Sequence, residues 1–200
     1  MLITFEGIEG AGKTTQINLL CRELEKRGIS FINIREPGGT PFSEQIRHIL
    51  LSKSFSAGSI AELLLFEASR AELVKDVIIP AITEKKIVIC DRFTDSTIAY
   101  QGYGRGLPIK VIKRLNEFVT AGVSIRRTYL LDSSLKVMEK RSAERIKDRI
   151  ENEDIDFHKR VKRGFLSIAR NNPERVLVID ATKDVEEIHK IIKDDFFRLL

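Results

Sequence analysis

Residues 7–14 read Gly-Ile-Glu-Gly-Ala-Gly-Lys-Thr and fit the pattern G-x-x-x-x-G-K-[ST]. Residues 2–5, Leu-Ile-Thr-Phe, form a short β-type run before the pattern, and an amphipathic run with helical spacing follows it. In this setting glycines let the backbone wrap closely around a polyphosphate and point successive N–H groups inward at a helix N-terminus. The stretch therefore predicts a strand, a phosphate-binding loop and a helix, and a chain that binds a nucleoside triphosphate.

The residues of this loop have distinct expected roles. Lys13 supplies a mobile positive charge for the β- and γ-phosphates, and the hydroxyl of Thr14 is placed to ligate Mg²⁺. We expect ATP to be the phosphoryl donor and to be bound by the whole loop. The residues of that loop are Gly7, Ile8, Glu9, Gly10, Ala11, Gly12, Lys13, Thr14 and Thr15.

Length and composition are those of an ordinary globular chain. Its 200 residues suit one domain, with 42% hydrophobic and 32% charged residues. No apolar run approaches the roughly 18 residues of a membrane span, and a strand begins at once, so we expect a soluble cytoplasmic protein without a targeting segment. Cys21 and Cys90 form no CxxC motif, and we expect buried free thiols. The net charge of +5 fits a small anionic substrate as well as nucleic acid.

Strand and helix patterns alternate along the chain, which predicts a parallel sheet wrapped on both sides. We expect an α/β fold of the three-layer P-loop NTPase type, with a five-stranded parallel sheet and helices on both faces, in one domain over residues 1–200. The expected strands are residues 2–6, 30–34, 87–90, 127–131 and 176–179. The expected helices are residues 14–26, 42–51, 59–85, 108–120, 135–145, 157–170 and 185–199. Pro80 should bend or end the third helix, and a polar loop should follow Cys90.

Two charged residues follow the third expected strand. Asp91 ends a buried strand, the usual place for a carboxylate that organises Mg²⁺, so Asp91 and Thr14 are the expected metal ligands. Arg92 comes next, where a hydrolytic motor often has a glutamate that activates water. A guanidinium suits a second phosphate instead, and the N-K-x-D signature of GTPases is absent from the sequence. The balance favours phosphoryl transfer to an anionic acceptor.

Five segments occur in a specific order along the chain. They are FEGIEGAGKTT at residues 5–15, REPGGT at 35–40, LLFEASRA at 64–71, DRF with STIAYQG between 91 and 102, and DRIE with FH between 148 and 158. Together they resemble the bacterial thymidylate kinases, which are P-loop nucleoside monophosphate kinases. The resemblance implies Mg²⁺-dependent transfer of the γ-phosphoryl group of ATP to dTMP, giving dTDP for dTTP synthesis and DNA replication.

The resemblance also implies roles in the acceptor site. Phe66 would stack on thymine, a contact worth about 1–3 kcal/mol, and Arg70 would hydrogen-bond a base carbonyl. Arg92 would hold the acceptor phosphate, because a planar guanidinium matches phosphate geometry. Tyr100 would lie against the sugar and crowd out a 2′-hydroxyl, which favours deoxyribose.

Further substrate-binding residues follow from the same motifs. Thr97 would contact the base edge and Gln101 would lie over the base. Glu36 would lie near the acceptor sugar and phosphate, and Glu9 near its 3′-hydroxyl. Ser96, in the segment that holds Thr97, is included among the substrate-binding residues.

A basic segment around residues 140–151 is the expected lid. Phosphoryl transfer depends on positioning and charge neutralisation, and water must be excluded, so a mobile basic cover is expected. The resemblance places catalytic arginines in the lid, because the phosphate loop lacks one. Arg149 is the first candidate, followed by Arg145 and Arg141, and the expected catalytic set also contains Lys13 and Arg92.

Two other functions stay open at this point. One is a kinase of the same fold for another nucleoside monophosphate, which Phe66, Arg70 and Tyr100 argue against because they suit a pyrimidine deoxynucleotide. The other is a nucleic-acid-binding ATPase, given the basic charge, although the sequence lacks a basic-aromatic recognition stretch. We expect no nucleic-acid or membrane partner. The resemblance suggests a homodimer packed through helices, and the apolar stretch at residues 60–77 fits either such a face or ordinary core.

Overall fold

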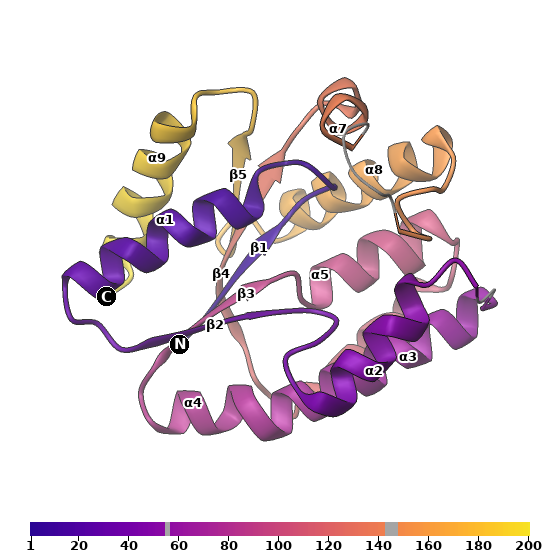
Figure 1. Ribbon diagram of the computed structural model, residues 1–200, viewed down its shortest axis with the longest axis horizontal. Coiled ribbons are helices and arrows are strands. Elements are labelled where there is room, and N and C mark those ends of the chain that lie inside the picture. Colours follow the sequence, from indigo (N-terminus) through magenta and orange to yellow (C-terminus); the bar gives the residue numbers. More distant parts are fainter. Residues whose placement is uncertain (55–56, 143–147) are drawn as a thin grey trace.

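Five parallel strands form a central sheet in the part of the chain that the structure describes (Figure 1). The structure is a computed structural model that describes residues 1–54, 57–142 and 148–200, with the backbone alone at residues 139–142. Neighbouring strands are parallel and lie in the order β2-β3-β1-β4-β5. The strands are β1 (Leu2–Glu6), β2 (Phe31–Arg35), β3 (Ile87–Asp91), β4 (Ile125–Asp132) and β5 (Val176–Asp180). The predicted five-stranded parallel sheet is confirmed.

Helices cover both faces of this sheet, as the alternating pattern predicts (Figure 1). They are α1 (Lys13–Lys26), α2 (Pro41–Leu51), α3 (Ser59–Leu73), α4 (Ile79–Thr83), α5 (Thr94–Thr97), α6 (Ile109–Val119), α7 (Leu135–Ser142), α8 (Ile155–Asn171) and α9 (Val185–Arg198). Two π-helical stretches follow α3 and α5 without a break, η1 (Val74–Ile78) and η2 (Ile98–Gly104).

Alternate residues of the strands enter different parts of the core. Ile3 and Phe5 of β1 pack in one cluster with buried residues of α1 and α9, such as Leu20 and Ile192. Leu2 packs in another cluster with the α3–η1–α4 segment, and a third cluster joins β4 and β5 to η2, α6 and α8. Because both faces are buried, the central strands are continuous apolar runs.

Strands β1 and β3 are parallel neighbours, so the loops that follow them meet at the carboxyl edge of the sheet. Open α/β sheets bind ligands at this edge.

The segment after β3 is helical, so the predicted polar loop was wrong. Elements α5 and η2 run without a break over residues 94–104. Two of its polar side chains, those of Asp95 and Gln101, are buried and paired within the protein. Nη1 of Arg175 donates to Oδ2 of Asp95 at 2.8 Å, and Nε2 of Gln101 donates to Oε1 of Glu62 at 3.0 Å. Polar composition predicts exposure only where such partners are missing.

The helix that carries Pro80 continues beyond this residue to Thr83. The chain changes from α3 to the π-helix η1 just before Pro80, which then lies in the first turn of α4. A first-turn proline leaves no intrahelical hydrogen bond unmade. Lys85, with a left-handed φ of 60°, follows the helix end. The helix therefore ends two residues before Lys85, the predicted end.

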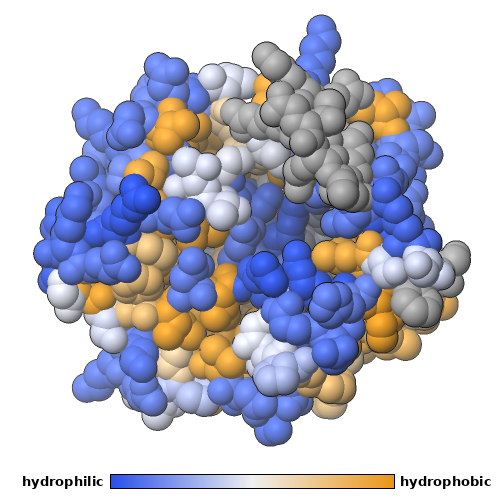
Figure 2. Space-filling model, in the orientation of Figure 1, coloured by the Kyte–Doolittle hydropathy of each residue, from blue (hydrophilic) through white to orange (hydrophobic). Residues whose placement is uncertain are grey.

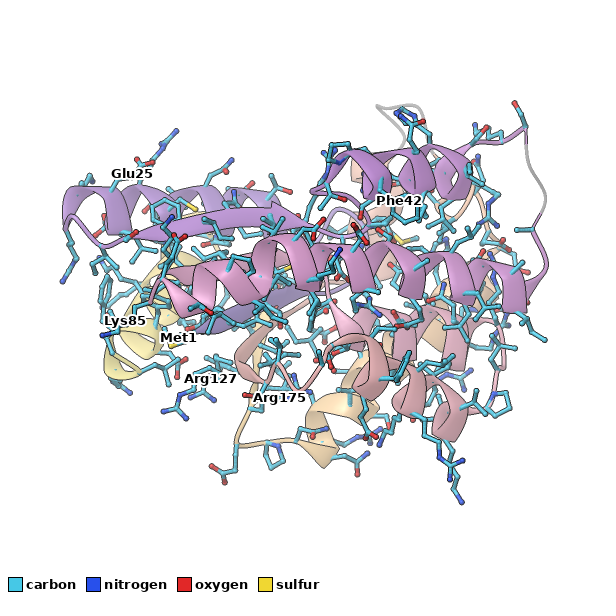
Figure 3. All side chains as sticks on the ribbon, turned by 90° about the horizontal axis from the view of Figure 1, so that it is seen from below. Met1, Glu25, Phe42, Lys85, Arg127 and Arg175 are labelled. Atoms are coloured by element: carbon cyan, nitrogen blue, oxygen red, sulfur yellow. The ribbon has the colours of Figure 1, made fainter. Side chains whose placement is uncertain are left out.

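Strand β4 is longer at both ends than predicted. Arg127 lies within it, and its Nη1 donates to the carbonyl oxygen of Glu174 at 2.8 Å while its Nη2 donates to Oδ1 of Asp195 at 3.1 Å. Arg127 and Arg175 lie at the same end of the sheet (Figure 3). Because these charges have partners on neighbouring elements, a strand can begin with the polar run Ile-Arg-Arg-Thr.

Two expectations from composition are met by the described residues. Cys21 and Cys90 are both buried and free, as predicted. None of the helices described is long and apolar enough to cross a membrane.

Candidate active site

The loop between β1 and α1 has the backbone that a phosphate-binding loop needs. Gly7, Gly10 and Gly12 have φ angles of 138°, 69° and 93°, a region that residues with a Cβ atom disfavour. At Gly7 an added Cβ atom would also lie 2.5 Å from the carbonyl oxygen of Leu131 in β4. Ile8, which follows, is buried in the core. Glycine at position 7 is therefore required both by conformation and by the close approach of β4.

Lys13 and Thr14 begin α1 beside the end of β3. Nζ of Lys13 donates to the carbonyl oxygen of Gly7 at 3.1 Å. Burial, helped by repulsion from Arg92, lowers the pKa of Lys13 to about 8, although nearby carboxylates oppose the shift. The hydroxyl of Thr14 donates to Oδ2 of Asp91 at 3.2 Å. An ammonium group and a hydroxyl–carboxylate pair thus lie together at the start of the helix.

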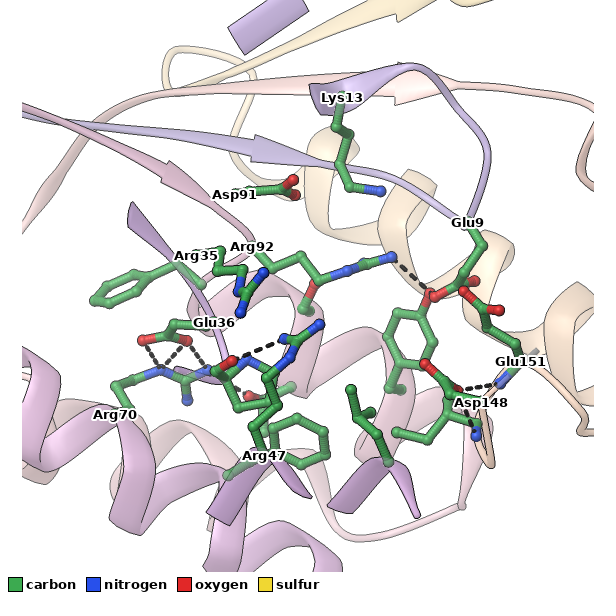
Figure 4. A pocket seen from close by; sticks show the side chains of 18 of the residues that line it. Glu9, Lys13, Arg35, Glu36, Arg47, Arg70, Asp91, Arg92, Asp148 and Glu151 are labelled. Carbon is green, nitrogen blue, oxygen red and sulfur yellow. Dashed lines mark hydrogen bonds and ion pairs between the residues drawn. The ribbon is translucent and has the colours of Figure 1, made fainter. Parts of the chain in front are cut away.

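A pocket of about 250 Å³ opens beside the loop, where the segments after β1, β2 and β3 meet α3 and η2. Figure 2 shows a hollow near the centre of the face, bordered largely by hydrophilic residues, and Figure 4 shows the charged side chains that line the pocket. The predicted residues that converge there are Glu9, Gly10, Lys13, Thr14, Glu36, Phe66, Arg70, Asp91, Arg92, Ser96, Thr97, Tyr100 and Gln101. Segments far apart in the sequence therefore form one site, which we call the acceptor pocket after the role that the sequence predicts for its residues.

A second groove, of about 360 Å³, lies on the other side of the loop. Its walls are the loop, the start of α1 and residues around the start of α9. The predicted residues Ala11, Gly12 and Thr15 line this groove, whereas Gly10, Lys13 and Thr14 line both spaces. The loop thus lies between two cavities and contributes these three residues to both.

Arg92 occupies a tight turn at the end of β3. Its φ of 71° is left-handed, a conformation that costs a residue other than glycine about 1–3 kcal/mol and is concentrated at functional sites. The backbone N–H donates to the carbonyl oxygen of Phe5 at 3.0 Å. In the side chain, Nη1 donates to the carbonyl oxygen of Gly7 at 2.9 Å and to Oγ of Ser96 at 3.1 Å, and Nη2 donates to Oε1 of Glu9 at 2.9 Å. The turn aims the guanidinium across the phosphate-binding loop.

Glu6, which the sequence analysis did not identify as a site residue, stabilises this turn through two hydrogen bonds. Its fully buried carboxyl group accepts the backbone N–H of Phe93 at 2.7 Å and the hydroxyl of Ser96 at 2.6 Å. Burial, with a contribution from Asp95, raises the pKa of Glu6 to about 8, against the opposing effect of Arg92. The available signal was a glutamate inside an otherwise apolar buried strand, where an unpaired acid is rare.

Glu9 and Tyr100 form the wall of the acceptor pocket next to Arg92. Oε1 of Glu9 accepts the Tyr100 hydroxyl at 2.6 Å in addition to the Arg92 guanidinium. Burial alone would raise the pKa of Glu9, but Arg92 and Lys13 outweigh burial and hold it below the ordinary glutamate value. Oε2 of Glu9 is buried and has no hydrogen-bond partner in the described part of the chain. Phe66 lines the same pocket from α3.

Arg70 is fully committed to protein acceptors. Nε and Nη2 bind the carboxylate of Glu36 at 2.9 and 2.6 Å, and Nη2 also donates to Oγ1 of Thr97 at 2.8 Å. Nη1 donates to Glu67 at 2.9 Å and to Asn116 at 2.8 Å. Burial raises the pKa of Glu36 to about 7, although Arg70 opposes the shift. The five N–H groups of Arg70 are thus all in use, a state that the predicted bond to a base carbonyl did not anticipate.

Comparison with known proteins identifies the origin of this arrangement. The model of the thymidylate kinase family matches residues 5–192. A thymidylate kinase of Kosmotoga olearia is 49% identical over 201 residues, which covers 100% of this chain and 97% of that protein. Another, of Sulfurihydrogenibium sp., is 49% identical over 193 residues and covers 96% and 94%. The crystal structure of thymidylate kinase from Ehrlichia chaffeensis has a TM-score of 0.81 at 39% identity and 98% coverage of both chains. The chain belongs to the thymidylate kinase family.

Thymidylate kinases are nucleoside monophosphate kinases, so this chain is a phosphotransferase that uses ATP to convert dTMP to dTDP. The enzyme class and the reaction inferred from the five sequence segments are thereby confirmed. The match over residues 5–192 also decides against the two alternatives, because it covers the base-site segments as well as the phosphate loop.

The predicted lid arginine of this thymidylate kinase does not reach the acceptor pocket. Nη2 of Arg149 donates to Oε2 of Glu62 at 2.6 Å, and its Nε donates to the carbonyl oxygen of Leu50 at 3.0 Å. Glu62 is buried and also accepts Gln101 and Arg105. These donors outweigh the effect of burial and lower the pKa of Glu62. Arg149 is therefore a partner of α2 and α3 in this structure.

The two other predicted lid arginines lie outside what the structure describes. Arg145 falls between the described residues 142 and 148, and the side chain of Arg141 is in the stretch described by its backbone alone. The structure therefore gives no position for either guanidinium.

Four charged residues of the kinase pocket were not predicted as site residues. Arg35, Arg47, Asp148 and Glu151 line the acceptor pocket with the predicted set (Figure 4). Nη1 of Arg47 donates to the carbonyl oxygen of Pro37 at 2.8 Å, and Oδ1 of Asp148 accepts two backbone N–H groups of the turn that follows it. Arg35 and Asp148 lie in segments that carry the family resemblance, whereas Arg47 is an ordinary helix arginine with no sequence signal.

Proposed function

We propose that dTMP binds in the acceptor pocket, that ATP binds along the phosphate loop and the second groove, and that Lys13 and Arg92 hold the reacting phosphates. The observation that carries this proposal is a shared contact. Nζ of Lys13 and Nη1 of Arg92 donate to the same carbonyl oxygen, that of Gly7, at 3.1 and 2.9 Å. Phosphate groups that replace this oxygen on the two cations would be neighbours, and phosphoryl transfer depends chiefly on such positioning and on charge neutralisation.

The acceptor nucleoside is proposed to lie between Phe66 and Tyr100. Phe66 offers a ring to the base, and Tyr100, fixed by its hydrogen bond to Glu9 at 2.6 Å, would exclude a 2′-hydroxyl from the sugar site. Two acceptors of Arg70 line the pocket, the carboxylate of Glu36 and the uncharged hydroxyl of Thr97. A base carbonyl would therefore bind Arg70 by sharing an N–H group with Thr97, which leaves the Arg70–carboxylate bonds in place.

Further predicted contacts are proposed from the pocket walls. Glu36 and Ser96 line the pocket, and the acceptor sugar and phosphate are proposed to lie beside them. Gln101 also lines it, and one N–H of its amide binds Glu62 at 3.0 Å, so its carbonyl oxygen is the group proposed to face the base. Glu9, which has one carboxylate oxygen without a partner among the described residues, is proposed to accept a hydrogen bond from the 3′-hydroxyl of the acceptor.

We propose that Thr14 and Asp91 hold the Mg²⁺ ion that accompanies ATP. Oγ1 of Thr14 and Oδ2 of Asp91 are 3.2 Å apart, close to the roughly 3 Å that separates neighbouring ligands in an octahedral Mg²⁺ site. Both residues line the acceptor pocket, and Thr14 also lines the second groove. When bound, the ion neutralises charge on the transferring phosphoryl group.

We further propose that the segment around residues 140–151 is a lid within a single-domain enzyme, and that Arg141 and Arg145 supply its catalytic charge. Arg149 is given an anchoring role instead, because Glu62 and the Leu50 carbonyl oxygen hold its guanidinium at 2.6 and 3.0 Å. An anchored end next to the pocket residue Asp148 would let the rest of the lid close over the phosphates.

A coupled ADP-release assay tests the acceptor assignment. With ATP and Mg²⁺ fixed, we expect kcat/KM for dTMP to exceed that for UMP, CMP, AMP and GMP by at least about a hundredfold, because the ring, hydroxyl and guanidinium groups of the pocket suit a pyrimidine deoxynucleotide. A dUMP reaction in the same panel measures the contribution of the thymine methyl group. Equal turnover of dTMP and AMP would overturn the assignment of Phe66, Arg70 and Tyr100.

We propose that the kinase is a homodimer that packs through α2, α3 and α6. Helix α3 packs against both of the others. Large apolar side chains on the three helices are 42–82% exposed, and Phe42 appears at the start of α2 in Figure 3. They are Phe42, Ile49, Ile60, Leu64, Val111 and Phe118. Exposed apolar residues on neighbouring helices are typical of an interaction surface. Within the predicted stretch 60–77, Ile60 and Leu64 belong to this surface, whereas Leu63 and Leu73 belong to the core.

Replacing Phe118 with glutamate is expected to convert the dimer to monomers, because the ring is 82% exposed on the proposed interface and a symmetric interface would bury two unpaired charges. Light scattering after size exclusion should then give the single-chain mass of 22.8 kDa. The control is Leu200→Glu, since Leu200 is 62% exposed but lies at the chain end, outside these helices. A wild-type protein of 22.8 kDa would refute the proposed dimer.

A cytoplasmic location is part of the same proposal. Both cysteines of the chain, Cys21 and Cys90, are free, which is typical of proteins kept in a reducing compartment. The proposal places the two substrates, ATP and dTMP, in this reducing compartment as well.

A further inference from the structure

The guanidinium of Arg70 has an edge toward the acceptor pocket and an edge away from it. Its Nε and Nη2 bind Glu36 and Thr97, and both of these residues line the pocket. Its Nη1 binds Glu67 and Asn116, and neither of these lines the pocket. Because a guanidinium is planar and its N–H groups form a rigid fork, the two acceptors on Nη1 fix the plane in which the other N–H groups are presented.

The two acceptors on Nη1 differ in what they can fix. Glu67 is on α3 itself, three residues before Arg70, so it moves with the arginine. Asn116 is on α6, and its bond to Arg70 joins residues 46 positions apart in the sequence. Only the bond to Asn116 therefore holds the guanidinium relative to a second element at this edge.

The orientation of the Asn116 side chain follows from its partner. A guanidinium has no acceptor atom, so the oxygen of the carboxamide must face Arg70 and its NH₂ group must face away. That nitrogen is buried and has no hydrogen-bond partner among the described residues. An asparagine retained only for packing would gain from an apolar side chain here, since an unpaired buried donor is unfavourable. The carbonyl oxygen toward Arg70 is the part of Asn116 that has a partner.

Charge explains why an amide suits this position better than an acid. Glu36 and Glu67 already place two carboxylates on one guanidinium, at 2.6 and 2.9 Å. A third carboxylate would add uncompensated charge to a buried cluster. Asn116 supplies an acceptor without charge.

We propose that Asn116 is a positioning residue for the acceptor pocket: its carbonyl oxygen fixes the plane of the Arg70 guanidinium and thereby the orientation of Glu36 and Thr97. The inference rests on the proposed role of Arg70 in dTMP binding. Asn116 acts on the substrate only through Arg70, and its influence is on the recognition of dTMP and not on ATP.

The test compares Asn116→Leu with Asn116→Asp in the full-length enzyme. Leucine has a similar shape but no acceptor, and we expect KM for dTMP to rise about tenfold, with kcat and KM for ATP within about twofold of wild type. Aspartate keeps an oxygen toward Arg70 but adds a third carboxylate to the cluster, so KM for dTMP should lie between the values of the wild type and Asn116→Leu. If leucine prevents folding, Asn116→Ala takes its place. Thr120→Val is the matched control, because Thr120 directly follows α6, is as buried as Asn116, 6% exposed, and its hydroxyl donates to the local carbonyl oxygen of Glu117.

A double-mutant cycle separates this inference from the proposal on which it rests. In an Arg70→Ala background, Asn116→Leu should have no further effect on KM for dTMP, since its route to the substrate is gone. An unchanged KM for dTMP in Arg70→Ala alone would overturn the proposed role of Arg70. A raised KM in Arg70→Ala with no change in Asn116→Leu, or equal changes in Asn116→Leu and Thr120→Val, would overturn the positioning role.

Discussion

Replacing Arg92 with alanine is expected to lower kcat/KM for dTMP about a thousandfold, because a guanidinium that clamps a reacting phosphate in a water-poor site is among the strongest single contributors to phosphoryl transfer. The side chain is 18% exposed and contacts both the phosphate loop and Glu9. Steady-state kinetics with varied dTMP at saturating ATP measure the effect. The dissociation constant for ATP, measured by calorimetry, should stay within about threefold of wild type, since Lys13 and the loop remain.

The design isolates the side chain from the turn. Alanine and arginine meet the same obstacle to a left-handed backbone, so Arg92→Ala leaves the strain at the φ of 71° in place. Arg127→Ala is the matched control. Arg127 is similarly buried, 17% exposed, and pairs with Asp195 of α9. It lies toward the amino-terminal end of β4, at the opposite edge of the sheet from the pocket. If Arg92→Ala retained more than a tenth of wild-type kcat/KM, or lost ATP and dTMP affinity equally, the acceptor-phosphate role would be wrong.

Elements whose signals are local could be predicted from the sequence. The phosphate loop is one, because the positive φ angles at Gly7, Gly10 and Gly12 require glycine at fixed spacing. The strands are another, since burial on both faces of a parallel sheet makes each strand an apolar run. The family resemblance also assigned Glu36, Phe66 and the residues after β3 to one acceptor site, and these residues line one cavity in the structure.

The direction of long side chains could not be predicted, because their partners are distant in the sequence. Arg149 lies in a basic segment next to the pocket, but its guanidinium turns to Glu62, 87 positions away. Glu62 belongs to no motif that was used, yet its buried carboxylate attracts three donors and decides the position of Arg149. A motif identifies a residue in the sequence, but the acceptor that its side chain binds in the folded protein determines its role.

Polar composition misled for the same reason. The residues after β3 read as a loop because Asp95, Thr97 and Gln101 are polar, yet each is less than 4% exposed and hydrogen-bonded to another element. Arg47 shows the reverse case, a helix arginine that reads as solvated and instead lines the pocket. Buried polar networks are specified by the whole fold, so sequence periodicity detects their apolar surroundings and not their members.

Glu6 is expected to stabilise the turn at Arg92. Glu6→Ala should therefore lower kcat/KM for dTMP about a hundredfold. Alanine removes the acceptor of the Phe93 N–H group and the partner of the Ser96 hydroxyl, which itself accepts Arg92 at 3.1 Å. The loss acts through the position of the guanidinium, where displacement of about 1 Å costs roughly that factor. The same kinetic assay measures it, and the dissociation constant for ATP should change less than kcat/KM for dTMP.

Glu6→Gln separates the shape of this residue from its charge. Because the pKa of Glu6 is raised to about 8, the folded protein keeps a proton on the carboxyl group at neutral pH. A glutamine amide reproduces that neutral form: its oxygen accepts Phe93, and its NH₂ group donates to the Ser96 oxygen, as a protonated Oε2 of Glu6 does in place of accepting the Ser96 hydroxyl. We therefore expect Glu6→Gln to keep kcat/KM for dTMP within about fivefold of wild type, whereas a Glu6 that works ionised would leave glutamine as inactive as alanine.

The pH dependence of stability independently tests whether Glu6 is protonated in the folded protein. Between the ordinary pKa of 4.5 and the folded-state value of about 8, the folded protein binds a proton at Glu6 that the unfolded chain has lost. The free energy of unfolding of the wild type therefore falls, through this group, as pH rises across that window. Glutamine does not titrate, and all other groups contribute nearly equally to both proteins. The melting temperature of Glu6→Gln minus that of the wild type should thus increase from pH 5 to pH 8, measured by thermal denaturation in matched buffers. A difference that stayed constant would mean that Glu6 ionises normally in the folded protein, and the turn would then depend on a charged pair of Glu6 with Arg92.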